Sequence, residues 1–201
     1  MKEIIFDFDG VIHDTFCFHL EHLRTFFGVT LTARELRDMS NGNIFESLPE
    51  QLKDADWGAY ADHIGMSFSL LPLRAEIRDT IEALAADYSL HIITSASGKV
   101  VEDFLVGNGV RKRFGDVLGW EHDRSKSVKF DSIFEKYDAD PSGCVFVTDT
   151  LGDILEAREV GVRTIAIDTG FHDRETLLKG KPHAIISNLE ELHRVIESLD
   201  E

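Results

Sequence analysis

The sequence contains few cysteines, little basic charge and no long hydrophobic run. Its two cysteines, Cys17 and Cys144, are far apart and lack metal-type spacing, which favours reduced, partly buried thiols over a disulfide framework. No apolar run approaches the length of a membrane-spanning helix, and the first expected strand begins almost at the N-terminus, which leaves no room for a signal peptide. We therefore expect a cytoplasmic protein that does not enter the membrane.

The charge balance narrows the range of partners. Lysine and arginine together number 21 against 37 acidic residues, for a formal net charge of −16. Nucleic acids and anionic membranes bind to concentrated basic surfaces, so neither is expected as a partner. The one basic cluster, residues 111–113, is interpreted as a solvated helix end. A hydrophobic fraction of 43% over 201 residues is typical of a globular protein with one substantial core.

Strands alternate with helices through most of the chain. Apolar runs predict strands at residues 4–12, 90–94, 116–120, 144–148, 164–167 and 184–187. Helical periodicity predicts helices at residues 14–27, 54–70, 74–88, 97–106, 127–137 and 152–160, with a short one from residue 32 and a last one from residue 189. This alternation predicts crossover units and a mainly parallel sheet, and so an α/β fold.

Residues 14–75 depart from that alternation because they contain only helices. Gly28 follows the first of these helices where a left-handed residue is favoured, and Thr32 and Glu35 have the spacing of a capping box at the start of the second. We interpret the segment as a small helical domain inserted between the first strand and the helix that leads to the second strand.

Carboxylates follow two of the predicted strands. Asp7 and Asp9 end the first apolar run, while Asp149 follows the strand at 144–148, with Asp153 four residues later. Ligands of open parallel sheets bind at the carboxyl ends of the strands, so these side chains are expected to converge there. Their mutual repulsion requires a divalent cation, and a set of oxygen ligands selects Mg²⁺.

Magnesium in turn suggests a phosphorylated ligand. Thr94 and Ser95 end the second strand and offer donors to phosphoryl oxygens. Lys126 or Lys129, at the start of the helix before the fourth strand, can reach the same edge as a point charge.

Three motifs in order identify a resemblance. They are Asp7-Phe8-Asp9-Gly10-Val11-Ile12-His13-Asp14-Thr15, then Ile92-Ile93-Thr94-Ser95, then Val145-Phe146-Val147-Thr148-Asp149-Thr150-Leu151-Gly152-Asp153. Over nearly its whole length the chain resembles hydrolases of the haloacid dehalogenase superfamily, close to the phosphoglycolate phosphatases. The resemblance implies a Rossmann-like catalytic core at residues 1–13 and 76–201 and a helical cap domain at 14–75.

The resemblance also implies roles for the carboxylates. Asp7 would be the nucleophile that forms an aspartyl-phosphate, and Asp9 the general acid and base. The dehalogenases lack the second aspartate, so Asp9 favours phosphoryl chemistry. Mg²⁺ would be held by Asp7, the main-chain carbonyl of Asp9 and Asp149, with Asp153 bound directly or through water.

The other catalytic positions follow from the same motifs. Thr94 would stabilise phosphoryl oxygens together with a lysine, for which the spacing favours Lys126 over the alternative Lys129. In the cap, the turn that contains Asn41 and Gly42 is the segment expected to contact substrate, as is Ser95 in the core. A plain surface loop is the alternative for that turn.

The remaining candidates receive structural interpretations. His19 and His22 lie three residues apart on the first helix and are assigned to a solvated face, and His13 is interpreted as a loop histidine without a catalytic role. Residues 170–172 resemble a segment that lies near the site in the phosphoglycolate phosphatase group.

The predicted function is Mg²⁺-dependent hydrolysis of a small phosphorylated metabolite by a monomer or homodimer. One alternative is a phosphomutase of the beta-phosphoglucomutase type, which the motifs separate poorly from a phosphatase. The other is a catalytically silent binding module, which would be expected to lack one of the essential carboxylates, and none is missing.

Overall fold

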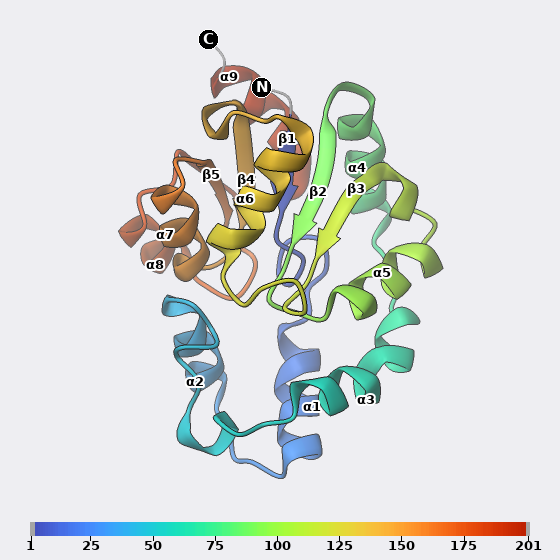
Figure 1. Cartoon of the computed structure of the whole chain (residues 1–201), viewed down its shortest axis with the longest axis vertical. Helices are drawn as coiled ribbons and strands as arrows, with labels where there is room; N and C mark the ends of the chain where they lie inside the picture. The colour runs from blue at the N-terminus through green and yellow to red at the C-terminus, as the bar shows by residue number, and fades with distance from the viewer. Residues whose placement is uncertain (1–2, 200–201) are drawn as a thin grey trace.

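The computed structural model describes residues 3–199 and contains one six-stranded sheet (Figure 1). Its strands are β1 (Glu3–Phe6), β2 (Ser89–Ile93), β3 (Phe114–Leu118), β4 (Cys144–Thr148), β5 (Arg163–Ile167) and β6 (Ala184–Ile186). They are arranged in the order β3-β2-β1-β4-β5-β6, and every neighbouring pair is parallel. This confirms the α/β class and the parallel sheet.

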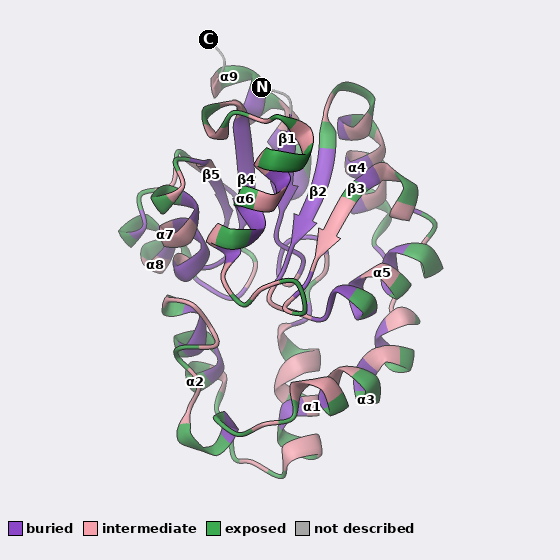
Figure 2. Ribbon diagram, in the orientation of Figure 1, coloured by how far each residue is buried: buried purple, intermediate pink, exposed green. Residues whose placement is uncertain are grey.

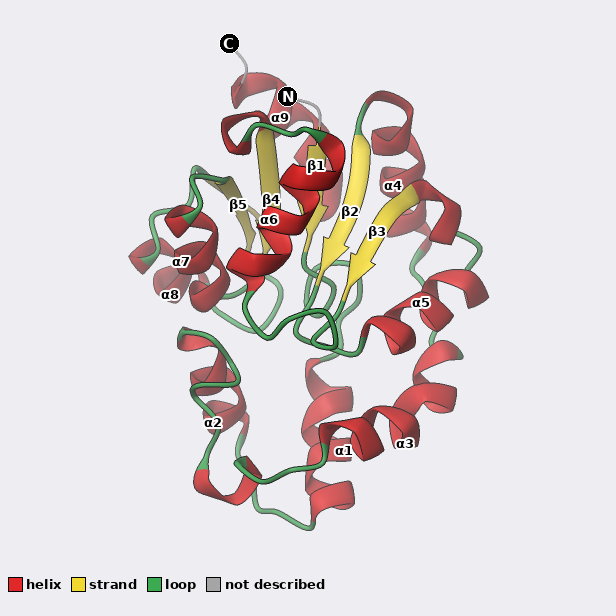
Figure 3. Cartoon of the chain, viewed as in Figure 1, coloured by secondary structure: helices red, strands yellow, loops and turns green. Residues whose placement is uncertain are grey.

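Helices connect the strands (Figure 3). They are α1 (Phe16–Phe27), α2 (Ala33–Asp38), α3 (Trp57–Ser69), α4 (Ala75–Asp87), α5 (Gly98–Gly107), α6 (Lys126–Tyr137), α7 (Leu151–Glu159), α8 (Arg174–Lys179) and α9 (Leu192–Leu199). The sequence did not predict α8, which spans only six residues and begins with Asp173 capping the backbone of Thr176. In the last helix, residues 189–191 form a 3₁₀ turn and α9 begins at Leu192.

The core lies on both faces of the sheet. On β1, Ile4 and Phe6 belong to the larger hydrophobic cluster, whereas Ile5 packs in a second cluster with Phe130 of α6 and Phe146 of β4. Successive strand residues point to opposite faces, so a strand covered on both sides is apolar at every position. β1 and β4 are accordingly buried throughout (Figure 2).

The prediction of a strand over residues 4–12 is wrong in length, because β1 ends at Phe6 and the chain then turns. The amide of Ile12 donates to the carbonyl oxygen of Phe8 at 2.9 Å, and Gly10 has φ of +73°. A Cβ at Gly10 would lie 1.9 Å from Oδ2 of Asp149, so the turn needs glycine both for its backbone angle and for space. Asp9 therefore lies on a tight turn and not on a strand.

Helices α1, α2 and α3 lie beyond the carboxyl ends of the strands (Figure 1). The predicted end of α1 and the predicted start of α2 are confirmed. Gly28, after α1, is left-handed with φ of +64°, and Thr32 and Glu35 form a capping box at the start of α2. The larger hydrophobic cluster extends from the sheet into these helices, joined by the rings of Phe8, Phe68 and Phe104. The division into a core at residues 1–13 and 76–201 and a cap at 14–75 stays a prediction.

Both cysteines are free, as expected, but only Cys144 is buried. Cys17 is exposed on α1, so the prediction of two partly buried thiols is wrong at that position. Within residues 3–199 no helix has both the length and the apolar character that crossing a membrane requires.

Candidate active site

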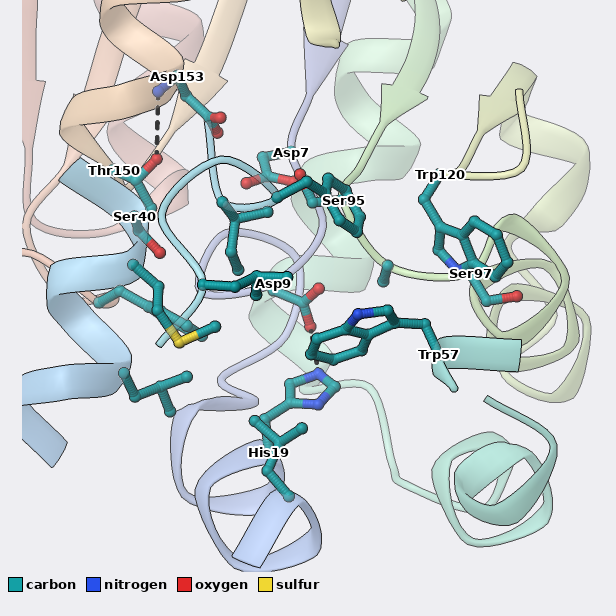
Figure 4. A pocket seen from close by; sticks show the side chains of 18 of the residues that line it. Asp7, Asp9, His19, Ser40, Trp57, Ser95, Ser97, Trp120, Thr150 and Asp153 are labelled. Carbon is teal, nitrogen blue, oxygen red and sulfur yellow. Dashed lines mark hydrogen bonds and ion pairs between the residues drawn. The ribbon is translucent and has the colours of Figure 1, made fainter. Parts of the chain in front are cut away.

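A cavity separates the carboxyl ends of the strands from α1, α2 and α3 (Figure 4). Its polar end brings together side chains that are distant in sequence, because the loops after β1, β2 and β4 and the first turns of α6 and α7 meet at one edge of the sheet. These are Asp7, Asp9, Ser95, Lys126, Asp149 and Asp153. The four carboxylates predicted to converge therefore line one cavity.

Lys126 lies between two of the carboxylates. Its Nζ is 2.9 Å from Oδ2 of Asp7 and 2.5 Å from Oδ2 of Asp153, and its side chain is 1% exposed. Ser125 caps the first turn of α6, and the amide of Lys126 donates to the Glu156 carboxylate, which fixes the start of the helix. Burial lowers the pKa of Lys126, but the two carboxylates outweigh it and the pKa is raised overall. The ammonium therefore stays charged.

Lys129 lies one turn further along α6 and has different partners. Its Nζ donates to the main-chain oxygen of Thr94 at 2.8 Å, and it does not line the cavity. Burial, together with the charge of Lys126, lowers the pKa of Lys129 to about 8. Of the two candidate lysines, Lys126 is the one that contacts Asp7.

Burial is the largest single influence on the pKa of each carboxylate, but it decides the direction of the shift only for Asp7 and Asp149. It raises the pKa of Asp149 to about 8, against a hydrogen bond from the Phe171 amide to Oδ2 at 2.6 Å. Burial also raises the pKa of Asp7 well above its usual range, although Lys126 opposes it. Burial acts in the same direction on Asp153, but the Lys126 charge and hydrogen bonds outweigh it and lower the pKa.

The residues at this edge fit a hard divalent cation. Oδ1 of Asp149 is buried and has no hydrogen-bond partner in the described part of the chain. A cation there would satisfy this oxygen and remove the cost of ionising Asp149 and Asp7. Within residues 3–199 no group of three or more acidic, histidine or cysteine side chains is placed to hold a metal ion by itself. Mg²⁺ does not need such a group, because it binds one or two carboxylates and keeps waters or substrate oxygens as its other ligands.

Asp9 is held by two groups from the helical segment. The Thr15 hydroxyl donates to Oδ1 of Asp9 at 2.6 Å, and Nε2 of His19 lies 3.1 Å from the same oxygen. The Tyr60 hydroxyl is 3.0 Å from the other ring nitrogen of His19. Burial raises the pKa of Asp9, but His19 and Thr15 outweigh it and the pKa is lowered overall.

His19 is a site residue that the sequence analysis missed, and its assignment to a solvated face is wrong. His19 lies one helical turn after Thr15, on a helix that begins where the first motif ends. This spacing could have identified His19 as a site residue from the sequence. His22 bonds to the carbonyl oxygen of Phe18 on its own helix, and His13 packs against the ring of Phe104. Neither lines the cavity.

The residues predicted to contact substrate divide into two groups. Ser95 and Gly42 line the cavity. Thr94 is fully buried just behind the wall, where its hydroxyl accepts from the Ala96 amide. Asn41 does not line the cavity; its side chain donates to Asp38 on the exposed side of the turn. The structure therefore places Asn41 outside the cavity, with its neighbours Ser40 and Gly42 lining it, and a contact between Asn41 and substrate stays a prediction.

Two contacts tie the helical segment to the sheet side of the site. The side chain of Asn43 donates to the Arg124 carbonyl oxygen and to Oε1 of Glu156, a lining residue that the sequence analysis did not single out. On the other side, Nε2 of His172 donates to the carbonyl oxygen of Arg37 on α2 at 2.9 Å, while its Nδ1 accepts from the Leu151 amide. The position expected for residues 170–172, close to the site, agrees with the Phe171 ring lining the cavity.

Comparisons with known proteins agree with this architecture. The family model described as "Haloacid dehalogenase-like hydrolase" matches residues 4–167. A phosphoglycolate phosphatase of Vibrio parahaemolyticus is 26% identical over 158 residues, covering 76% of this chain and 69% of that protein. One of Synechococcus elongatus is 25% identical over 209 residues, covering 99% of each. A solved haloacid dehalogenase-like hydrolase of Streptococcus pneumoniae has the same fold, with a TM-score of 0.82, 21% identity and coverage of 98% of both chains.

Proposed function

The chain belongs to the haloacid dehalogenase-like hydrolase family, and from this premise we propose that it is a Mg²⁺-dependent phosphatase acting on a small phosphorylated metabolite. The observation that carries the proposal is the buried Lys126 ammonium between Asp7 and Asp153, in the same cavity as Asp9 and Asp149. A nucleophile, a second carboxylate for proton transfer and a fixed positive charge are the groups that phosphomonoester hydrolysis through a covalent intermediate requires.

In the first half of the reaction, Asp7 attacks phosphorus. A bond forms between its carboxylate oxygen and phosphorus while the bond to the alcohol oxygen breaks, which leaves an aspartyl-phosphate. Protonated Asp9 gives its proton to the departing oxygen. The Lys126 ammonium offsets charge on the phosphoryl oxygens.

In the second half, Asp9 acts as a base. Its carboxylate takes a proton from a water molecule that attacks phosphorus, and the Asp7 carboxylate is released together with inorganic phosphate. The contacts from His19 and Thr15 that lower the pKa of Asp9 favour this ionised form. They also fix the direction of the carboxylate, because they bind the same oxygen.

Asp7, Asp149 and the main-chain carbonyl of Asp9 would hold the Mg²⁺ ion, with Asp153 bound directly or through water. When bound, the ion supplies positive charge for the phosphoryl oxygens. The unpartnered Oδ1 of Asp149 supports this assignment.

The test measures phosphate release from a panel of small phosphorylated metabolites by the native protein and by the Asp7→Asn variant. We expect turnover with Mg²⁺, its loss in EDTA, and a decrease of about 10³-fold or more in Asp7→Asn, since an amide cannot form the intermediate. Asp103→Asn, an exposed change in an ion pair with Lys99, is the matched control and should retain native turnover. Undiminished turnover by Asp7→Asn would refute the nucleophile assignment. Conversion of a sugar phosphate that needs a bisphosphate primer and releases no phosphate would instead identify a phosphomutase.

A further inference from the structure

Away from the carboxylates, the cavity wall is mostly apolar, with Ser40, Ser97 and Tyr60 among the exceptions. Counted out to its opening and including the solvent there, the cavity holds about 1110 Å³ of empty space. Every helix of the segment beyond the sheet contributes to the apolar end, as do the turns between them. Representative lining residues are Leu23, Met39, Ile44, Leu48, Trp57 and Ile64. Figure 4 shows the Trp57 ring in this wall, with Trp120 on the sheet side.

Positive charge is scarce along the same wall. Among the described residues that line the cavity, the basic side chains are Lys126 and His19, and both are already bonded to carboxylates. Two arginines, Arg37 and Arg124, contact lining residues but do not line the cavity themselves. Arg37 donates to the Phe171 carbonyl oxygen and stacks on Phe16, and Arg124 lies over the Phe45 ring.

A second anionic group on the substrate would therefore be poorly accommodated. Once its phosphoryl group occupies the polar end, a carboxylate elsewhere in the molecule would face the apolar wall or the acidic side chains of Asp9 and Glu156. Burying a charge without a partner is strongly unfavourable, whereas an apolar group gains by leaving water.

We propose that the substrate is the phosphomonoester of an uncharged alcohol that carries an aromatic or branched aliphatic group. The inference rests on the proposed phosphatase function and specifies its substrate class. It separates this chain from relatives named for phosphoglycolate, whose leaving group carries a carboxylate.

The first test compares phosphate release from benzyl phosphate and from phosphoglycolate with Mg²⁺ present. Both substrates release a primary alcohol whose oxygen Asp9 protonates, so the comparison reports on the leaving-group pocket more than on intrinsic reactivity. We expect kcat/KM to be at least about tenfold higher for benzyl phosphate, the lower end of what one hydrophobic contact contributes to specificity. Equal or better turnover of phosphoglycolate would overturn the substrate class and leave the phosphatase function standing.

Acetyl phosphate tests the proposed phosphatase function separately from the proposed substrate class. It is small and reactive, and it needs the phosphoryl site but little of the apolar wall. Because its acetate leaves without a proton, release of phosphate from it tests the phosphoryl site and the nucleophile without the apolar wall. If acetyl phosphate, benzyl phosphate and phosphoglycolate are all left intact, the proposed function fails and the substrate class fails with it.

The second test uses matched variants on α3. Trp57 lines the cavity, whereas Met66 on the same helix is 79% exposed and does not. We expect Trp57→Ala to lower the ratio of kcat/KM for benzyl phosphate over acetyl phosphate by about tenfold, and Trp57→Phe to restore most of it. Met66→Ala should leave the ratio unchanged. An unchanged ratio in Trp57→Ala would overturn the assignment of this wall to the leaving group.

Discussion

Replacing Lys126 with methionine should destabilise the metal-free protein by about 3–5 kcal/mol at pH 7.5, the usual cost of removing one partner from a buried ion pair. The ammonium is 1% exposed and lies within 2.9 Å of Asp7 and 2.5 Å of Asp153. Methionine fills a similar volume, so the loss is electrostatic and leaves two buried carboxylates without their counter-charge.

The loss of stability in Lys126→Met should depend on pH, and the direction of this dependence follows from the two carboxylates. The pKa of Asp7 is already raised in the native protein, whereas Lys126 holds the pKa of Asp153 below its usual value. Without Lys126, burial raises the folded-state pKa of Asp153 above the unfolded value. A group with a raised pKa contributes stability that is present below its unfolded pKa and lost as the pH rises through the folded pKa. Keeping one carboxyl protonated in the folded state costs about 4.9 kcal/mol of stability at pH 7.5 but only about 1.5 kcal/mol at pH 5, if its pKa in the unfolded state is about 3.9. The destabilisation should therefore shrink by about 3 kcal/mol at pH 5.

Urea unfolding in EDTA, followed by circular dichroism at both pH values, measures the effect. Lys129→Met is the control: Lys129 is equally buried on the same helix, but its Nζ donates a single hydrogen bond, to the Thr94 carbonyl oxygen. That change should cost about 1–2 kcal/mol at pH 7.5, the price of one unsatisfied acceptor. Equal losses in the two variants, or a loss in Lys126→Met that is the same at both pH values, would refute the reasoning.

Two further changes test the contacts between the helical segment and the sheet. His19→Gln removes the imidazole that lowers the pKa of the general acid, so the alkaline limb of kcat/KM should move to higher pH, while His22→Gln leaves the profile in place. A profile that does not move would argue against this role for the imidazole. Gly152→Ala places a Cβ 2.2 Å from the Gly42 carbonyl oxygen and should lower the free energy of unfolding by about 1–3 kcal/mol. In Gly143→Ala the new Cβ meets no atom within 4 Å, so the free energy of unfolding, measured in urea, should change by less than about 0.5 kcal/mol. Similar free energies of unfolding for the two variants would show that the turn at Gly42 moves without cost.

Periodicity predicted most of the fold because the pattern has a direct physical cause. The strand β4 was predicted with its observed bounds, since all five of its residues are buried and apolar or hydroxyl-bearing. Shorter elements carry weaker patterns, and α8 was missed for that reason. The end of β1 was misplaced because the apolar residues after Phe6 are buried in a turn, and burial alone does not distinguish a turn from a strand.

The sequence by itself determined which chemical groups this protein can bring to a phosphorylated ligand. The order of Asp7, Asp9, Thr94 and Asp149 along the chain, each at the end of an apolar run, with Asp153 four residues after Asp149, was sufficient to place them at one edge of a parallel sheet. This worked because parallel strands joined by crossover helices all end at the same edge of the sheet, so residues that follow them are brought together there.

Only the tertiary structure decided how those groups are paired and what surrounds them. Lys126 and Lys129 are both fully buried on one helix, and their different partners follow from where the neighbouring strands end. The contact between His19 and Asp9 and the apolar wall of the cavity depend on how α1, α2 and α3 pack over the sheet. The residues in these contacts are not related by the repeat of a helix or a strand, so no local sequence pattern predicts which of them meet.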